Sequence, residues 1–151
     1  MSSERLWSPA FINYGVSSGI FYMTQYVLVA ALPIILTAEL GGTALDAGLA
    51  MTYFQIGTIL CRPFAGRLID GLDKRIILLI SSVLFFIIMG LFNLTTSLQT
   101  IFVLRGIHGA IFALGTTVMA ALAVVVLPAS RKGEGINMFA VFSNIAMVLG
   151  P

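Results

Sequence analysis

Long runs of apolar residues alternate with short polar breaks along the whole chain. The apolar runs cover residues 9–37, 45–66, 76–96, 101–127 and 135–151. A transmembrane helix needs about 20 mostly apolar residues, so each of the first four runs is long enough to cross a bilayer. The pattern predicts an all-α, polytopic membrane helix bundle with four full spans and a shorter fifth that reaches residue 151.

Composition narrows the class of protein further. Hydrophobic residues make up 59% of the chain and charged residues 9%, against about 45–50% and about 25% in soluble domains. A net charge of +2 is too small for a surface that neutralises several phosphates of a nucleic acid. One cysteine and one histidine exclude a disulfide framework and form no cluster with the spacing of a metal site. We therefore expect the lipid bilayer as partner, and no enzyme activity, nucleic acid, metal or cofactor.

The basic residues of the breaks fall on one side of the predicted membrane. The breaks on the opposite side hold only the acidic residues Glu39 and Asp46. Cytoplasmic loops are enriched in Lys and Arg, so this asymmetry predicts a cytoplasmic N-terminus. We expect a multi-pass protein of the cell membrane, in a bacterial inner membrane or a plasma membrane. The segments assigned to the cytoplasm carry Arg5, Arg67, Lys74, Arg75, Arg131 and Lys132.

Polar side chains gather on one broad face of the first span. Amides and hydroxyls this deep in a bilayer need hydrogen-bond partners. Two interpretations stay open: the face joins neighbouring helices, helped by the GxxxG pair Gly15 and Gly19, or it lines a water-filled cavity, which we favour. The candidate cavity residues on this span are Asn13, Ser17, Tyr22, Thr24 and Gln25.

The fourth span carries the strongest chemical signal. Arg105 and His108 lie one turn apart, and Phe112 and Thr116 share their face. A charged residue inside a span is costly and usually faces the interior of a bundle or an aqueous cavity. The alternatives are an arginine that reaches towards the outer surface and a histidine that serves packing alone. Because His108 is the one deeply placed group that titrates near neutral pH, we favour a site for substrate or proton coupling.

Three short motifs resemble those of the major facilitator superfamily. The break after the second span resembles the family's loop signature, although Gly71 and Asp73 depart from it. Arg105 and Gly109 resemble its R-x-x-x-G motif. The end of the chain resembles the opening of the antiporter motif, with Ala146 in place of the first glycine. The matching residues are Gly66, Leu68, Asp70, Lys74 and Arg75 in the loop, and Gly150 and Pro151 at the end.

The resemblance implies a secondary transporter built from two halves of six helices that rock around a central substrate. In that arrangement the first and fourth helices line the cavity, the third lies outermost, and the loop signature acts in gating. The drug:proton antiporter branch implies efflux of small apolar or amphipathic compounds, with the proton as coupling ion. We expect this chain to be an incomplete N-terminal half of such a protein, without the second half. The alternative is a non-transporting half with a self-association or partner-binding role.

Self-association has its own physical argument. Without a second half, the polar faces of the first and fourth spans would meet lipid, and so would five residues of the second span: Phe54, Gln55, Gly57, Thr58 and Arg62. Each arginine placed in hydrocarbon costs about 2.5–3.5 kcal/mol on insertion scales. Two copies would remove this cost by placing these faces together, so we expect a homo-oligomer.

Overall fold

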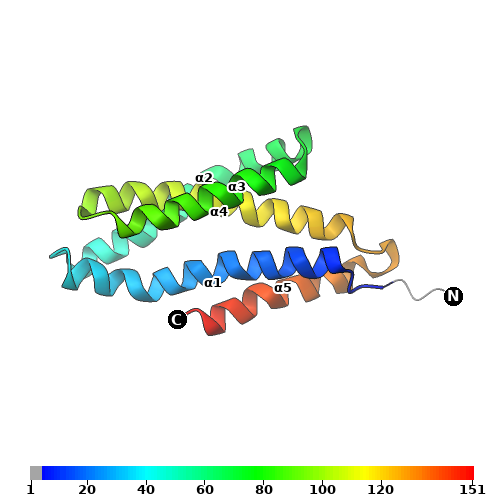
Figure 1. Ribbon diagram of the computed structural model, residues 1–151, viewed down its shortest axis with the longest axis horizontal. Coiled ribbons are helices and arrows are strands. Elements are labelled where there is room, and N and C mark those ends of the chain that lie inside the picture. The colour runs from blue at the N-terminus through cyan, green and yellow to red at the C-terminus, as the bar shows by residue number, and fades with distance from the viewer. Residues whose placement is uncertain (1–4) are drawn as a thin grey trace.

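The chain folds into an all-α bundle, as the apolar pattern predicts (Figure 1). The computed structural model describes residues 5–151. Helices α1, α2, α3 and α4 are each long and apolar enough to cross a membrane, so the all-α membrane fold is confirmed. The helices of this part of the chain are α1 (Pro9–Ala38), α2 (Ala44–Gly71), α3 (Lys74–Asn93), α4 (Leu98–Val125) and α5 (Lys132–Leu149), with the short 3-10 turn η1 (Ala129–Arg131) before α5.

Each predicted span overlaps one helix, and the largest difference lies at the end of α2. There the helix continues beyond residue 66 to Gly71, because Arg67 and Asp70 end the apolar pattern without breaking the backbone hydrogen bonds. The helix starts carry local signals. Asp46 and Thr43 form a reciprocal capping box at the start of α2, and the Asp73 side chain accepts from a backbone N–H at the start of α3.

Helix α4 is the centre of the bundle. Within its membrane-crossing stretch 56% of the residues are buried, against 22% in α1, α2 and α3. It packs against all four other helices, most extensively against α2. Helix α3 buries the row Ile77, Ser81, Phe85 and Ile88. Its Leu78, Met89 and Phe92 are half-buried, and its other apolar residues are exposed, as expected of a helix that faces lipid.

Glycines bring the backbones of α2 and α4 into contact. A Cβ atom added to Gly57 would overlap the carbonyl of Gly106, and one added to Gly109 would overlap the carbonyl of Phe54. The Thr58 hydroxyl donates both to Phe54 of its own helix, at 2.9 Å, and to the Gly109 carbonyl of α4, at 3.2 Å. Small residues permit this close approach, which replaces the hydrophobic driving force that lipid does not supply.

Glycines also permit close packing between α1 and α5. Gly15 and Gly19 face Phe142 of α5, and a Cβ atom at Gly15 would overlap that ring. At the end of α5, a Cβ atom at Gly150 would press on Tyr26 of α1. The GxxxG pair of the first span therefore serves helix packing.

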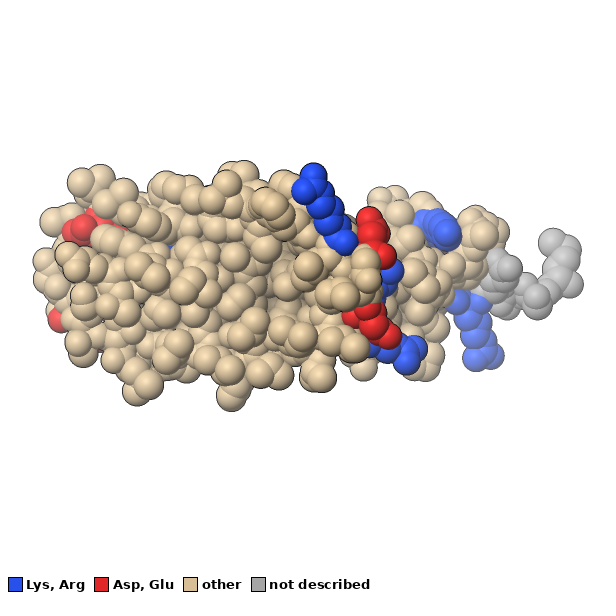
Figure 2. Space-filling model, turned by 90° about the horizontal axis from the view of Figure 1, so that it is seen from above, with Lys and Arg blue, Asp and Glu red and all other residues tan. Residues whose placement is uncertain are grey.

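The charged residues separate along the bundle. The N-terminal end of α1, the loop between α2 and α3, and the connection from α4 to α5 lie at one end (Figure 1). On the face seen in Figure 2, Lys and Arg side chains gather towards that end, and only acidic side chains stand at the other. The structure thus keeps the charge asymmetry of the sequence, while the side of the membrane on which each end lies stays a prediction.

The glycine contact gives a first test. Gly57→Ala should lower the free energy of unfolding by about 1–3 kcal/mol, because the added methyl group has no space against α4. The measurement is unfolding of the purified chain in detergent, followed by circular dichroism. Gly66→Ala is the matched control on the same helix: nothing lies within 4 Å of its added Cβ, so it should be neutral or stabilising. Equal destabilisation by both variants would contradict the close α2–α4 contact.

Candidate functional site

Arg105 is completely buried in α4, with 0% of its surface exposed. Its Nη1 donates to Gln25 Oε1 of α1 at 3.1 Å, and its Nε donates to the Ala50 carbonyl of α2 at 3.4 Å. Its Nη2 lies 3.3 Å from Met51 Sδ, and its Cζ stands 4.6 Å above the Phe54 ring centroid. A single side chain thus joins α1, α2 and α4. The alternative that Arg105 reaches towards the surface is wrong.

The guanidinium has no carboxylate partner within residues 5–151, where the ion pair that forms joins Arg131 and Glu134. An amide oxygen, a backbone carbonyl, a thioether and an aromatic face surround the positive charge instead. Burial of a charge is expensive unless its hydrogen bonds are satisfied, so this arrangement needs every partner in place.

His108 completes the cluster. Its Nδ1 lies 3.2 Å from Arg105 Nη1, and an arginine can only donate, so Nδ1 accepts and the ring proton of a neutral imidazole sits on Nε2. Nε2 is buried and has no hydrogen-bond partner within the described chain. A buried donor without a partner lowers the stability of the fold by about 1–3 kcal/mol. Such a cost suggests that the position serves a function. The ring lies 5.1 Å from Phe54, 5.2 Å from Phe85, 5.9 Å from Phe92 and 6.4 Å from Phe112, centroid to centroid.

A cavity of about 340 Å³ lies beside this cluster, between α1, α2, α4 and α5. Tyr22 connects the two, because its ring meets Phe112 edge-on at 5.1 Å and also lines the cavity. Hydroxyl groups and one guanidinium face the space. The lining residues are Ser18, Tyr22, Arg62, Thr116, Thr117, Ala120, Ile136, Phe139, Ala140 and Ser143.

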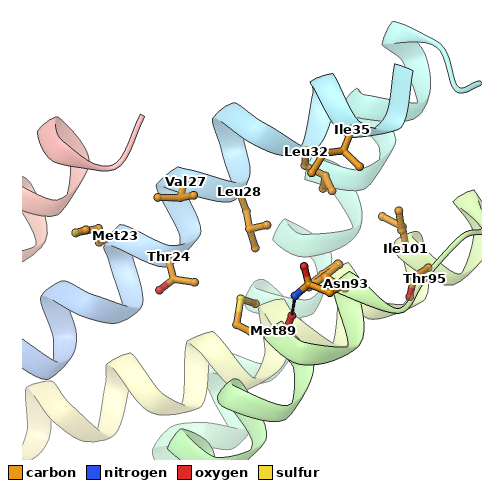
Figure 3. A pocket seen from close by; sticks show the side chains of 11 residues that line it. Met23, Thr24, Val27, Leu28, Leu32, Ile35, Met89, Asn93, Thr95 and Ile101 are labelled. Atoms are coloured by element: carbon orange, nitrogen blue, oxygen red, sulfur yellow. Dashed lines mark hydrogen bonds between the residues drawn. The ribbon is translucent and has the colours of Figure 1, made fainter. Parts of the chain in front are cut away.

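A second cavity, of about 380 Å³, is mostly apolar and lies between the C-terminal half of α1 and the facing ends of α3 and α4 (Figure 3). Thr24 and Asn93 stand among its lining residues, but both are bonded within their own helices: the Thr24 hydroxyl donates to the Ile20 carbonyl at 2.9 Å, and the Asn93 amide donates to the Met89 carbonyl at 3.3 Å. The other groups that line this cavity are mostly apolar, so it suits an apolar occupant.

The structure divides the candidate residues of the first span among several places. Gln25 joins Arg105, His108 and Phe112 of the fourth span in one cluster. Tyr22 and Thr116 line the neighbouring cavity, whereas Thr24 faces the apolar one. Asn13 and Ser17 bond to each other at 3.3 Å on the exposed side of α1. The two interpretations of the polar face thus apply to different parts of the same helix.

The residues that α2 contributes to the cluster had no signal of their own in the sequence. Ala50, Met51 and Phe54 are apolar, and only their spacing of one helical turn places them together. The expectation that Phe54 and Thr58 would meet lipid is wrong, because both pack against α4 and are 4% and 6% exposed. Gln25 and Arg105 are buried too. Of the polar residues expected to meet lipid, Gln55 and Arg62 are exposed in the structure.

The loop signature lies at the end of α2 and the start of α3. Leu68, Asp70 and Arg75 are exposed and Lys74 is half-buried, and within residues 5–151 Asp70 has no hydrogen-bond or ion-pair partner. Asp73, which departs from the signature, accepts from the Arg75 N–H at 2.7 Å and so caps α3. No atom of the described chain lies within 4 Å of a Cβ atom added at Gly66, so no helix packs closely against it there. Of the two terminal motif residues, Gly150 packs on α1 and Pro151 is exposed.

The connection between α4 and α5 is held by an ion pair. Arg131 Nη2 lies 2.7 Å from Glu134 Oε1 and Arg131 Nε lies 2.8 Å from Glu134 Oε2. The hydrogen bonds from Arg131, and its charge, hold the pKa of the Glu134 carboxyl below its ordinary value. Both side chains are solvent-exposed, so the pair orients the connection more than it stabilises the fold.

Known proteins match this chain over most of its length. The family model described as Major Facilitator Superfamily covers residues 14–151. The quinolone resistance protein NorA of Staphylococcus aureus (strain MRSA252) is 26% identical over 125 residues, which are 83% of this chain and 32% of NorA. The staphylopine export protein of Staphylococcus aureus (strain Mu50 / ATCC 700699) is 26% identical over 155 residues, which are 100% of this chain and 37% of that protein. The chain thus spans about a third of the length of the curated relatives it matches.

Gln25 offers a direct test of the cluster. Gln25→Leu keeps the size of the side chain but removes the oxygen that receives Arg105 Nη1, so the free energy of unfolding should fall by about 1.5–3 kcal/mol. Chemical unfolding of the detergent-purified chain measures it. Gln55→Leu is the matched control, because Gln55 is an exposed glutamine of α2 and should change stability little. A Gln25 variant as stable as the Gln55 variant would show that Arg105 does not need this partner.

Proposed function

Because the chain belongs to the Major Facilitator Superfamily, we propose that it acts in a secondary active transporter that exports small apolar or amphipathic compounds. Members of this family are in general transporters and not enzymes. The names of both relatives, a resistance protein and an export protein, favour outward transport. The cavity of about 340 Å³ beside the Arg105 cluster is lined by aromatic rings and hydroxyls from several helices, which suits loose recognition of amphipathic molecules.

The observation that carries this proposal is the buried cluster of Arg105, His108 and Gln25. An ionisable group inside a membrane helix is expensive to keep, and such groups mark substrate or ion pathways. Here the guanidinium is bonded to two other helices, so a change in its bonds changes how α1, α2 and α4 fit together. A transporter that alternates between two arrangements needs a link between binding at its site and the packing of its helices.

Proton coupling is the mechanism that we propose for this cluster. A second proton on His108, at Nδ1, would place two positive groups 3.2 Å apart and replace a hydrogen bond with repulsion. Arg105 would then have to move or exchange partners, and the helices that it joins would respond. A carboxylate elsewhere in the transporter is the alternative proton carrier.

We also propose a cytoplasmic N-terminus in a cell membrane. This orientation is supported by the charge asymmetry of the bundle, in which basic side chains gather towards one end (Figure 2).

His108→Gln tests the coupling. The side-chain oxygen of the introduced glutamine can accept from Arg105 as Nδ1 does, but it cannot bind a proton near neutral pH. The fold should therefore be kept while transport driven by a pH gradient weakens. The measurement is substrate flux in vesicles that contain the full-length transporter, with and without the gradient. Substrate exchange without a gradient should persist in the variant. An unchanged dependence on pH would assign the proton to another residue.

The loop signature gives a second functional test. Asp70 has no partner within residues 5–151, and the family resemblance implies that it acts in gating, so Asp70→Asn should reduce transport at equal expression. Asp73→Asn is the matched control, because asparagine caps a helix about as well as aspartate does. Comparable loss of flux in the two variants would remove the distinction between a gating and a capping carboxylate.

A further inference from the structure

Arg62 is a guanidinium inside a candidate membrane span, and its surroundings differ from those of Arg105. It is exposed on α2, and no residue of the described chain, 5–151, donates to it, accepts from it or pairs with it. It lines the cavity of about 340 Å³ between α1, α2, α4 and α5. A cation in a span without a partner is a candidate for binding an anion that comes from elsewhere.

Three of the hydroxyl groups that line this cavity already donate hydrogen bonds within the protein. Thr116, Thr117 and Ser143 each donate their hydroxyl proton to a carbonyl of their own helix, at 2.8, 2.6 and 2.8 Å. The hydroxyls of Tyr22 and Ser18, by contrast, have no partner within residues 5–151. No carboxylate stands among the lining residues. The donors that remain are therefore the Arg62 guanidinium and the hydroxyls of Tyr22 and Ser18, and they favour a ligand that accepts hydrogen bonds and carries negative charge.

The remaining lining suits an apolar body. Ile136 and Phe139 of α5 and the ring of Tyr22 lie around the same space. A volume of about 340 Å³ lies within the range of small-molecule sites, which begins at about 300 Å³. The guanidinium is planar and matches a carboxylate through two parallel hydrogen bonds.

We propose that this cavity binds an organic acid, whose carboxylate Arg62 holds and whose apolar body lies against α5 and Tyr22. The proposal rests on the proposed export function and goes beyond it by naming the class of compound. A lipid headgroup would not require this cavity, because an arginine that serves lipid extends to the membrane surface. Here groups from α1, α4 and α5 surround the same space as Arg62.

The test compares two probes of the same shape. Equilibrium dialysis of 1-naphthoate and of the neutral 1-naphthamide, against the chain in nanodiscs of phosphatidylcholine, measures the preference for charge. Wild type should bind naphthoate about tenfold more tightly than naphthamide, because one hydrogen bond between charged groups changes the affinity by about that factor. Arg62→Gln should abolish the preference and leave naphthamide binding unchanged. Arg67→Gln is the matched control, because Arg67 is an exposed arginine of the same helix outside the cavity lining, and it should keep the preference.

Several outcomes would overturn the proposal. A preference that survives Arg62→Gln, a preference lost equally in Arg67→Gln, or no binding of either probe would each do so. Displacement of naphthoate by phosphatidylglycerol in the nanodisc would assign Arg62 to a lipid headgroup. A wild-type chain that is a dimer by light scattering, where Arg62→Gln is a monomer, would assign Arg62 to a second copy.

Failure of this test is distinct from failure of the proposed function. Dialysis needs neither a gradient nor transport, so a charge preference at Arg62 can stand even if vesicles show no flux. Conversely, flux with no charge preference would keep the exporter and reject the organic acid as its ligand.

Discussion

A positive charge buried inside a membrane bundle without a carboxylate partner in the described chain dictates the packing around it. Arg105 is stable there only because Gln25 of α1 and the Ala50 carbonyl of α2 come within hydrogen-bonding distance. Three helices must therefore meet at one level. The glycine contacts make this possible, since Gly57 and Gly109 let α2 approach α4 closely enough to place Phe54 under the guanidinium.

The same constraint explains how α1 is used. On one side its glycines pack against α5, and on the other Gln25 reaches α4, so the helix is held between two neighbours. Tyr22, one turn before Gln25, then stands between the aromatic rings around His108 and the cavity that contains Arg62. The charged cluster and the cavity are adjacent. His108 contacts Phe112, and Phe112 contacts Tyr22, so a movement of Arg105 and His108 would displace a side chain that lines the cavity.

Hydrophobic patterning alone was enough to predict the helices, because a bilayer requires long apolar runs and the breaks between them are polar. The spacing of Arg105 and His108 was enough to predict that they lie on one face. The partners from α2 could not be predicted, since nothing local distinguishes a phenylalanine under a guanidinium from one in lipid. The polar residues of α1 could not be assigned one common role either. The helix meets different surroundings along its length, so Asn13 and Gln25 have different neighbours.

His108 allows the most direct measurement of the central claim, because it is the only histidine of the chain and its signals need no assignment. Nitrogen NMR of the ¹⁵N-histidine-labelled chain in nanodiscs reports which ring nitrogen carries the proton. An Arg105 that donates to Nδ1 requires the proton on Nε2 and none on Nδ1. A proton on Nδ1 would contradict the contact, and with it the account of how the buried charge is held.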